Sequence, residues 1–289
     1  MIIFVQIKFK HVKSIFDELS LKISKITTKR YSTSFSLGIL FLKPAIRPAI
    51  YAIYGFVRFA DEIVDSFHGF DKKNLLEEFE LDTQKAIERK ISLNPILNSF
   101  QKVVHDYQIE YDLIDGFLQS MYMDLDPQNY DQKLYEKYIF GSAEVVGLMC
   151  LRVFTEGNNE EYEKLKPFAQ KLGSAFQKVN FLRDFSADNK ELGRIYFPNV
   201  AENDFNEDNK KVIEDDIKSE FDESLIGIKM LPKNAQFGVY VAYIYYLSLF
   251  EKIKYKASND VINGRIRIPN FQKCMLLIKS YFKYRLVGI

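Results

Sequence analysis

Residues 172–188, LGSAFQKVNFLRDFSAD, place a polar stripe on a helix that is otherwise apolar and aromatic. A helix turns by about 100° per residue, so Gln177, Asn180, Asp184 and Asp188 fall within roughly 80° of one another. Two aspartates four residues apart direct their oxygens toward one point above the helix. Hard divalent cations such as Mg²⁺ take oxygen ligands of this kind and keep their other positions for water and substrate phosphates.

A second stretch, YAIYGFVRFADEIVD at residues 51–65, repeats this arrangement. By the same count Tyr54, Arg58, Asp61 and Asp65 lie within roughly 60° of one another, and the opposite side of the helix is apolar. One such aspartate pair is usually part of a solvated or salt-bridged surface. Two pairs on apolar helices instead predict an internal site, because a buried carboxylate pair needs compensating cations. Facing each other, the two helices would hold Mg²⁺ with a diphosphate between them.

The composition excludes several classes of protein. With 289 residues, 47% of them apolar, the chain can bury a large core. Its 40 Lys and Arg against 39 Asp and Glu lack the basic excess of a nucleic-acid-binding protein, so no nucleic acid is expected as a partner. Cys150 and Cys274 are isolated, and the opening MIIFVQIKFK lacks the features of a secretory signal. A reduced, cytoplasmic setting is expected.

Helical periodicity and sparse Gly and Pro predict an all-α fold. One domain is expected over residues 21–289, preceded by an N-terminal tail and the start of the first helix in residues 1–20. The uncharged stretch 234–250 reaches only the lower limit of a membrane span and is predicted to be a buried helix. The expected helices cover residues 12–28, 33–41, 46–66, 73–89, 93–106, 110–124, 131–155, 160–188, 209–229, 233–258 and 270–286.

Several ordered motifs resemble the squalene and phytoene synthase family, the head-to-head trans-prenyltransferases. The similar segments are YSTSF (31–35), AIYAIYGFVRFADEIVD (49–65), YIFGSAEVVGLMC (138–150), LGSAFQKVNFLRDFSADNKELGRIYFP (172–198) and RIRIPNFQK (265–273). The resemblance implies an isoprenoid-synthase-type helical bundle with a large central cavity. Two positions depart from the family pattern: Glu62 stands where a second aspartate is common, and Glu144 where a small residue is common.

The family roles carry over to matching positions of this chain. The metal ligands would be Asp61, Asp65, Asn180, Asp184 and Asp188, binding Mg²⁺ or, alternatively, Mn²⁺. The diphosphates would be bound by Ser32, Ser34, Arg58, Arg183, Arg194, Tyr196 and Arg265. The residues at the reacting centre would be Tyr54, Tyr138 and Gln177, together with Arg58, Arg183 and the metal ligands.

The resemblance implies prenyl diphosphates as substrates. We expect a phytoene synthase that joins two geranylgeranyl diphosphates and needs no NADPH. The alternatives are a squalene or dehydrosqualene synthase acting on two farnesyl diphosphates, and a non-catalytic scaffold protein that has kept the fold. Peripheral contact with the inner face of a membrane, for product release, stays open.

Overall fold

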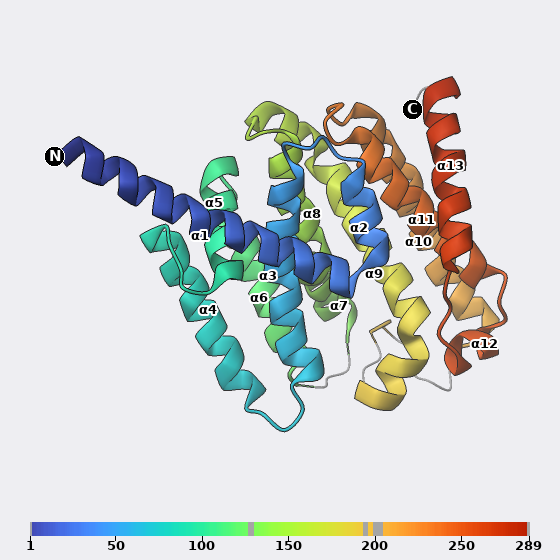
Figure 1. Ribbon diagram of the computed structural model, residues 1–289. Coiled ribbons are helices and arrows are strands. Elements are labelled where there is room, and N and C mark those ends of the chain that lie inside the picture. The colour runs from blue at the N-terminus through green and yellow to red at the C-terminus, as the bar shows by residue number, and fades with distance from the viewer. Residues whose placement is uncertain (1, 127–129, 193–195, 199–204, 288–289) are drawn as a thin grey trace.

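The computed structural model describes residues 2–126, 130–192, 196–198 and 205–287, and leaves aside the side chains of residues 2–12, 187–192, 270 and 285–287. Within these ranges every regular element is helical, which confirms the all-α prediction (Figure 1). The elements are α1 (Ile2–Tyr31), α2 (Thr33–Leu40), α3 (Arg47–Ser66), α4 (Lys72–Arg89), α5 (Pro95–Tyr107), α6 (Tyr111–Met123), α7 (Gln132–Ile139), the π-helical turn η1 (Phe140–Glu144), α8 (Val145–Phe154), α9 (Asn159–Leu192), α10 (Glu207–Met230), α11 (Gln236–Lys254), α12 (Ser258–Asn263) and α13 (Asn270–Val287).

Most helix boundaries follow the local sequence signals. Asn94 caps α5 by accepting a hydrogen bond from the Ile96 backbone at 3.0 Å, and Pro95 occupies the first helical position. Three features differ from the expectation: α1 begins at Ile2 rather than near residue 12, the span 131–155 contains the π-helical turn, and α12 is an additional short helix. In Figure 1 the first turns of α1 extend beyond the bundle.

A seam of small residues lets α1 lie directly against α3 and α5. The Ser24 hydroxyl is 2.7 Å from the Ser99 hydroxyl, and both residues are buried. A methyl group on Gly55 of α3 would lie only 3.1 Å from the Ser24 hydroxyl. The close approach brings α1 across the central helix α3 and fixes one side of the bundle.

The apolar side of α3 packs into an aromatic core. The Phe56 ring stacks on Phe100 of α5 at a centroid distance of 4.0 Å and lies 5.7 Å from the ring of Phe79 of α4. Phe56 and Phe100 are completely buried, and such burial contributes about 1.5–3 kcal/mol per side chain. Because this side of α3 is fixed in the core, its polar stripe faces the other way.

The π-helical turn between α7 and α8 is held by contacts that leave no room for side chains. A methyl group on Gly141 would lie 2.5 Å from the Gly116 carbonyl oxygen of α6, and one on Gly173 of α9 would lie 2.9 Å from the Ala143 carbonyl oxygen. Only glycine permits these approaches. The turn therefore sits between α6 and α9, backbone against backbone, at the wall of the cavity described next.

Candidate active site

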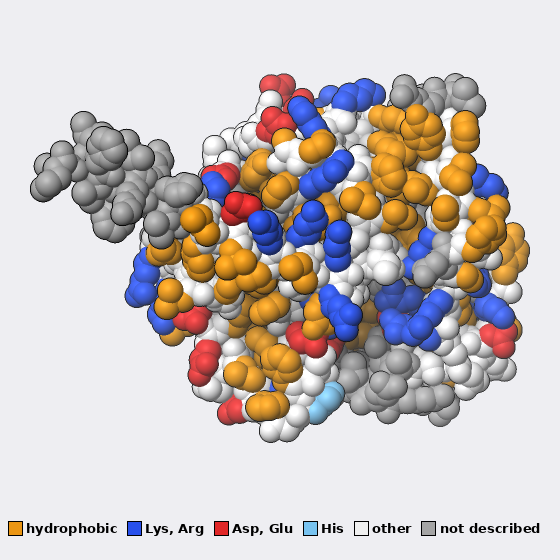
Figure 2. Space-filling model, in the orientation of Figure 1, with side chains coloured by type: hydrophobic (Ala, Val, Ile, Leu, Met, Phe, Trp, Pro, Cys, Tyr) orange, Lys and Arg blue, Asp and Glu red, His pale blue; other side chains and the backbone are white. Residues whose placement is uncertain are grey.

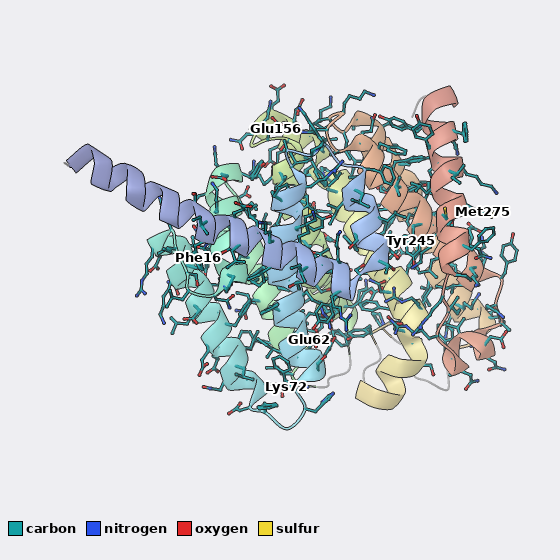
Figure 3. All side chains as sticks on the ribbon, viewed as in Figure 1. Phe16, Glu62, Lys72, Glu156, Tyr245 and Met275 are labelled. Carbon is teal, nitrogen blue, oxygen red and sulfur yellow. The ribbon has the colours of Figure 1, made fainter. Side chains whose placement is uncertain are left out.

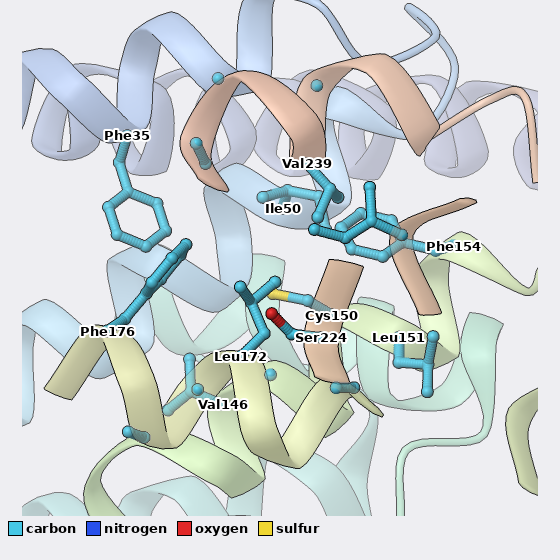
Figure 4. Close-up of a pocket in the computed structure, with 18 of the residues that line it drawn as sticks. Phe35, Ile50, Val146, Cys150, Leu151, Phe154, Leu172, Phe176, Ser224 and Val239 are labelled. Carbon is cyan, nitrogen blue, oxygen red and sulfur yellow. The ribbon is translucent and has the colours of Figure 1, made fainter. Parts of the chain in front are cut away.

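An apolar cavity of about 290 Å³ lies inside the bundle (Figure 4). Its lining comes from α2, α3, η1, α8, α9, α10 and α11. Along α9 the lining extends from Leu165 to Asn180, which corresponds to about 22 Å at 1.5 Å per residue. Figure 4 shows Phe35 and Phe176 at one end of the cavity and Phe154 toward the other. The shape suits a long apolar chain rather than a compact molecule.

Tyrosine and amide side chains line the cavity at the Phe35 end, whereas the Ser224 hydroxyl lies further along it, near Cys150 (Figure 4). The ring of Tyr54 lies 5.6 Å from that of Phe35, and Tyr246 of α11 stacks on Phe176 at 3.9 Å. Tyr54 and Tyr246 interact electrostatically, and Tyr246 is hydrogen-bonded to Asn180. Gln177, whose amide oxygen is 3.5 Å from the Asn180 amide nitrogen, completes the group. The cavity therefore has one polar end, and the rest of its lining is mostly apolar.

The first acidic stripe continues from this polar end down α3. Arg58 is paired with both Asp61 and Glu62, and its guanidinium lies over the Tyr31 ring at 4.3 Å. Figure 3 labels Glu62 near the lower end of α3. Burial, and then the neighbouring charge of Asp65, raise the pKa of Asp61 to about 7. Such crowded carboxylates gain from a cation, which is the property expected of a metal site.

Two arginines hold the acidic group of the second stripe. Arg183 Nε donates to Asp184 at 3.0 Å, and Arg265 Nε, from the segment after α12, lies 2.7 Å from the other Asp184 oxygen. Burial alone would lower the pKa of Arg183, but Asp184 outweighs that effect and raises it. The predicted residues Arg183, Asp184 and Arg265 are thus brought together by the fold.

Each stripe interacts with a tyrosine at the polar end of the cavity: Tyr54 for the first stripe, and Tyr246 of α11 for the second. Burial raises the pKa of Tyr54 to about 12 despite the opposing effect of Arg58, and Asp61 also acts on this phenol. At Tyr246, where burial likewise raises the pKa of the phenol, the charge of Arg183 lowers this pKa and that of Asp184 raises it. The Asp188 side chain and Arg194 lie outside the described residues, so the complete set of four aspartates stays a prediction.

The chemistry of the available donors fits a hard divalent cation. The Asn180 amide oxygen is buried and has no hydrogen-bond partner among the described residues. It lies on the same helix face as Asp184, and a buried amide oxygen without a donor is a ready ligand for Mg²⁺. Within the described part of the chain, no three acidic, histidine or cysteine side chains converge closely enough to hold a metal ion. Asp184 is instead bonded to Arg183 and Arg265.

The two serines of the early motif point to different places. Ser32 caps α2 by accepting from the Phe35 backbone at 3.1 Å, and it is also hydrogen-bonded to Tyr54 at the polar end. Ser34 lines a small crevice between α2, α11 and α13, together with Tyr245 and Lys273. Neither serine lines the main cavity, but Ser32 lies next to it through its interaction with Tyr54.

Tyr138 and Tyr196 meet at a buried carboxylate. The Tyr138 hydroxyl donates to both oxygens of Asp124, at 3.0 and 2.9 Å, and the Tyr196 hydroxyl lies 3.4 Å from one of them. The two phenol rings stack at 5.0 Å, with Phe181 against Tyr196 at 4.2 Å. Burial and Asp124 hold the pKa of Tyr138 well above its usual value, so this phenol stays protonated and acts as a donor.

Asp124 and Tyr246 are the residues that sequence reasoning missed. Asp124 ends α6 and acts electrostatically on Asp61, so it belongs to the same charged region. A lone aspartate at a helix end gives no periodic signal, and Tyr246 lies among other tyrosines of an apolar helix. Glu144, one of the two departures from the family pattern, accepts a hydrogen bond from Gln170 at 2.9 Å.

Comparison with known proteins gives concordant results. The family model for squalene/phytoene synthase matches residues 28–272. The 4,4'-diapophytoene synthase of Staphylococcus haemolyticus is 31% identical over 62% of this chain and 62% of that protein. The 15-cis-phytoene synthase of Synechocystis sp. is 27% identical over 92% of this chain and 86% of that protein. A crystal structure of a dehydrosqualene synthase with ligand superposes with a TM-score of 0.79, at 21% identity, over 93% of this chain and 98% of that one.

Proposed function

The chain belongs to the squalene/phytoene synthase family, and from this premise we propose that it joins two geranylgeranyl diphosphates head to head to give phytoene. The observation that carries the proposal is the polarity of the cavity. One end gathers Tyr54, Asn180 and Tyr246 beside the Arg58–Asp61 and Arg183–Asp184 groups, and the rest of the lining is mostly apolar. A diphosphate fits the charged end, and a prenyl chain fits the apolar length.

We propose that Asp61, Asp65, Asn180, Asp184 and Asp188 hold Mg²⁺. When bound, Mg²⁺ would neutralise the charge that develops on the diphosphate leaving group. Arg58, Arg183 and Arg265 would bind the phosphate oxygens, because a guanidinium offers a planar fork of donors that matches them. Asp184 holds two of these arginines in the described structure, so it would preorganise them for the anion.

The reaction requires that carbocations be kept from water. In the first half-reaction the allylic C–O bond of one substrate breaks. The double bond of the second substrate then forms a bond to the cation, and loss of a proton closes a cyclopropane. In the second half, the remaining diphosphate leaves, the skeleton rearranges and a second proton is lost. The apolar lining excludes water, and aromatic faces such as Phe176 and Tyr246 each stabilise a nearby cation by about 0.5–2 kcal/mol.

Two observations support a twenty-carbon donor. The α9 wall is about 22 Å long between Leu165 and Asn180. In addition, the relatives named 15-cis-phytoene synthase align over nearly the whole chain. Because another relative is named 4,4'-diapophytoene synthase, a product of two farnesyl diphosphates is the second candidate. Because the final step of the proposed reaction is proton loss, no NADPH is required.

Product identification tests the proposal directly. The protein is incubated with geranylgeranyl or farnesyl diphosphate and Mg²⁺, with and without NADPH, and the hydrocarbon is identified by chromatography and mass spectrometry. We expect a C40 product that does not depend on NADPH. A preferred C30 product would replace the substrate assignment, and no product at all, with no thermal protection by Mg²⁺ and diphosphate, would favour the scaffold alternative.

A matched pair of variants tests the role of the acidic site. Asp61→Asn should lower kcat by at least about 100-fold, because metal ligation contributes several kcal/mol of transition-state stabilisation. The control Asp82→Asn removes an exposed carboxylate of α4 that is paired with Lys85 at the surface, and it should leave kcat unchanged. Equal activity of the two variants would exclude a role of Asp61 in binding the metal.

A further inference from the structure

The last helix, α13, has the composition of a helix that lies at a charged surface. Its residues, NFQKCMLLIKSYFKYRLV, include four basic side chains and no acidic one. The exposed lysines are Lys279 and Lys283. In a chain whose net charge is only +1, this places a local excess of +4 on one helix. Such a helix attracts anionic partners.

One face of α13 is fixed against the bundle. The Tyr284 hydroxyl donates to the Gln236 amide oxygen at 2.9 Å, and its ring lies 4.8 Å from that of Phe237. The Ser280 hydroxyl is buried and donates to the Leu276 carbonyl at 2.7 Å. The orientation of the helix is therefore set, and its opposite face points outward.

That outward face is an apolar stripe. Phe271, Met275, Ile278 and Phe282 are spaced so that they fall within roughly 60° of one another on the helix. Their exposed fractions are 74, 41, 52 and 57%. Figure 2 shows hydrophobic side chains gathered over this side of the molecule, and Figure 3 labels Met275 on α13. Large apolar side chains in one exposed row mark an interaction surface.

The stripe continues onto neighbouring elements. Tyr281 is 45% exposed, and the centroid of its ring lies 6.0 Å from that of Phe282 and 6.0 Å from that of Phe237 of α11. Phe237 in turn contacts Phe41 at 5.3 Å, next to Leu40, which is 45% exposed at the end of α2. The apolar surface thus spans α13, α11 and α2. On its inner side, α2 and α11 contribute Gly38 and Gly238 to the cavity wall.

We propose that this face, the α13 surface, docks on an anionic lipid bilayer with α13 lying flat in the interface. An interfacial helix combines an aromatic and aliphatic stripe with flanking lysines, and α13 has both. None of the described helices could span a bilayer. The uncharged stretch 234–250, predicted to be a buried helix, lies almost entirely in α11, where Leu249 and Phe250 are fully buried, so we assign the membrane contact to α13.

Charge argues against a second copy of the chain as the occupant. A symmetric dimer through α13 would place two helices with the same sign of charge against each other. Like charges across an interface are unfavourable, whereas a bilayer containing acidic phospholipid supplies the opposite sign. The surface therefore fits a membrane better than it fits itself.

Vesicle co-sedimentation without substrate tests this proposal independently of catalysis. The probes are vesicles of phosphatidylcholine alone and of equal parts phosphatidylcholine and phosphatidylglycerol. We expect binding at least about tenfold tighter to the anionic vesicles, and a loss of at least about tenfold in Ile278→Ser/Phe282→Ser. Lys279→Gln/Lys283→Gln should remove much of the preference for anionic vesicles without changing the weak binding to neutral ones.

The matched control is Phe70→Ser/Leu93→Ser, which removes two other exposed apolar side chains, 71 and 93% exposed, outside α13. It should bind vesicles like the parent, and all variants should melt within a few degrees of it. The proposal is overturned if the parent does not bind anionic vesicles, or if the control loses as much binding as the α13 variant. It is also overturned if light scattering shows a dimer that Ile278→Ser/Phe282→Ser dissolves while vesicle binding stays unchanged.

Discussion

Any side chain at Gly227 of α10 is predicted to destabilise the protein, because α9 and α10 pack closely against each other at this position. A methyl group built on Gly227 would lie 2.2 Å from Phe168 Cβ and 2.8 Å from Phe168 Cγ. Carbon atoms normally approach to about 3.5–4.0 Å, so the first contact is short by more than about 1 Å. Rotation of the Phe168 side chain does not move its Cβ, so the two helices would have to separate.

The magnitude follows from two opposing effects. Overpacking of this kind costs about 1–3 kcal/mol, and a clash anchored to the backbone belongs at the upper end. Replacing a helical glycine by alanine stabilises the helix by about 1 kcal/mol. We therefore expect Gly227→Ala to lower the free energy of unfolding by about 2 kcal/mol, or the melting temperature by about 4–8 °C.

Gly116→Ala is the matched control. The nearest atom to its added methyl group would be Val145 Cγ1 at 3.5 Å, an ordinary contact, so this variant should be as stable as the parent or slightly more so. Urea unfolding and thermal melting measure both variants. Phe168→Ala should not rescue Gly227→Ala, because it keeps the offending Cβ, whereas Phe168→Gly should recover part of the loss. A Gly227→Ala protein as stable as Gly116→Ala would refute the reasoning.

Two further predictions concern the carboxylates of Asp124 and Asp61. Asp124→Ala should lower the free energy of unfolding in urea by about 3 kcal/mol, because it leaves the buried Tyr138 hydroxyl without its acceptor. Asp124→Asn keeps an acceptor and should cost about 1 kcal/mol, so equal losses would contradict the hydrogen-bond explanation. For Asp61, burial and Asp65 raise the pKa to about 7 from the unfolded value of 3.8, so the folded protein binds this proton more tightly. The associated stability is present below about pH 4 and is lost as the pH rises through about 7. In EDTA, melting temperatures should fall between about pH 4 and pH 7, and Asp61→Asn should flatten that decline; parallel profiles would show that Asp61 is not its source.

The sequence was sufficient for features set by local periodicity. The 3.6-residue repeat located most of the helices, including α3, α4 and α10, to within a few residues. The same angular count put Tyr54, Gln177 and Asn180 on faces that line one cavity. Such faces are predictable because one helix turn fixes the direction of each side chain before any tertiary contact forms.

Features that depend on tertiary packing could not be found in this way. Together with burial, Asp124 raises the pKa of Asp61 in α3, and it accepts a hydrogen bond from Tyr138 in α7. Tyr246 interacts with Asn180, although the two residues are 66 positions apart in the chain. Residues 131–155 show an uninterrupted helical pattern, so the local sequence does not predict the π-helical turn. The turn depends instead on the glycine contacts with α6 and α9. Periodicity also could not show that Arg265 would reach Asp184 rather than solvent.

Substitutions at the glycines in the cavity wall can make the cavity narrower but not wider. Lining positions where a methyl group would come within 3.2 Å of another atom are Gly147, Gly173, Gly227 and Gly238. Since glycine has no side chain to shorten, no substitution at these positions can enlarge the cavity. Evolution or engineering toward a bulkier product must therefore act on the aliphatic and aromatic lining, while the glycine positions set the minimum thickness of the wall.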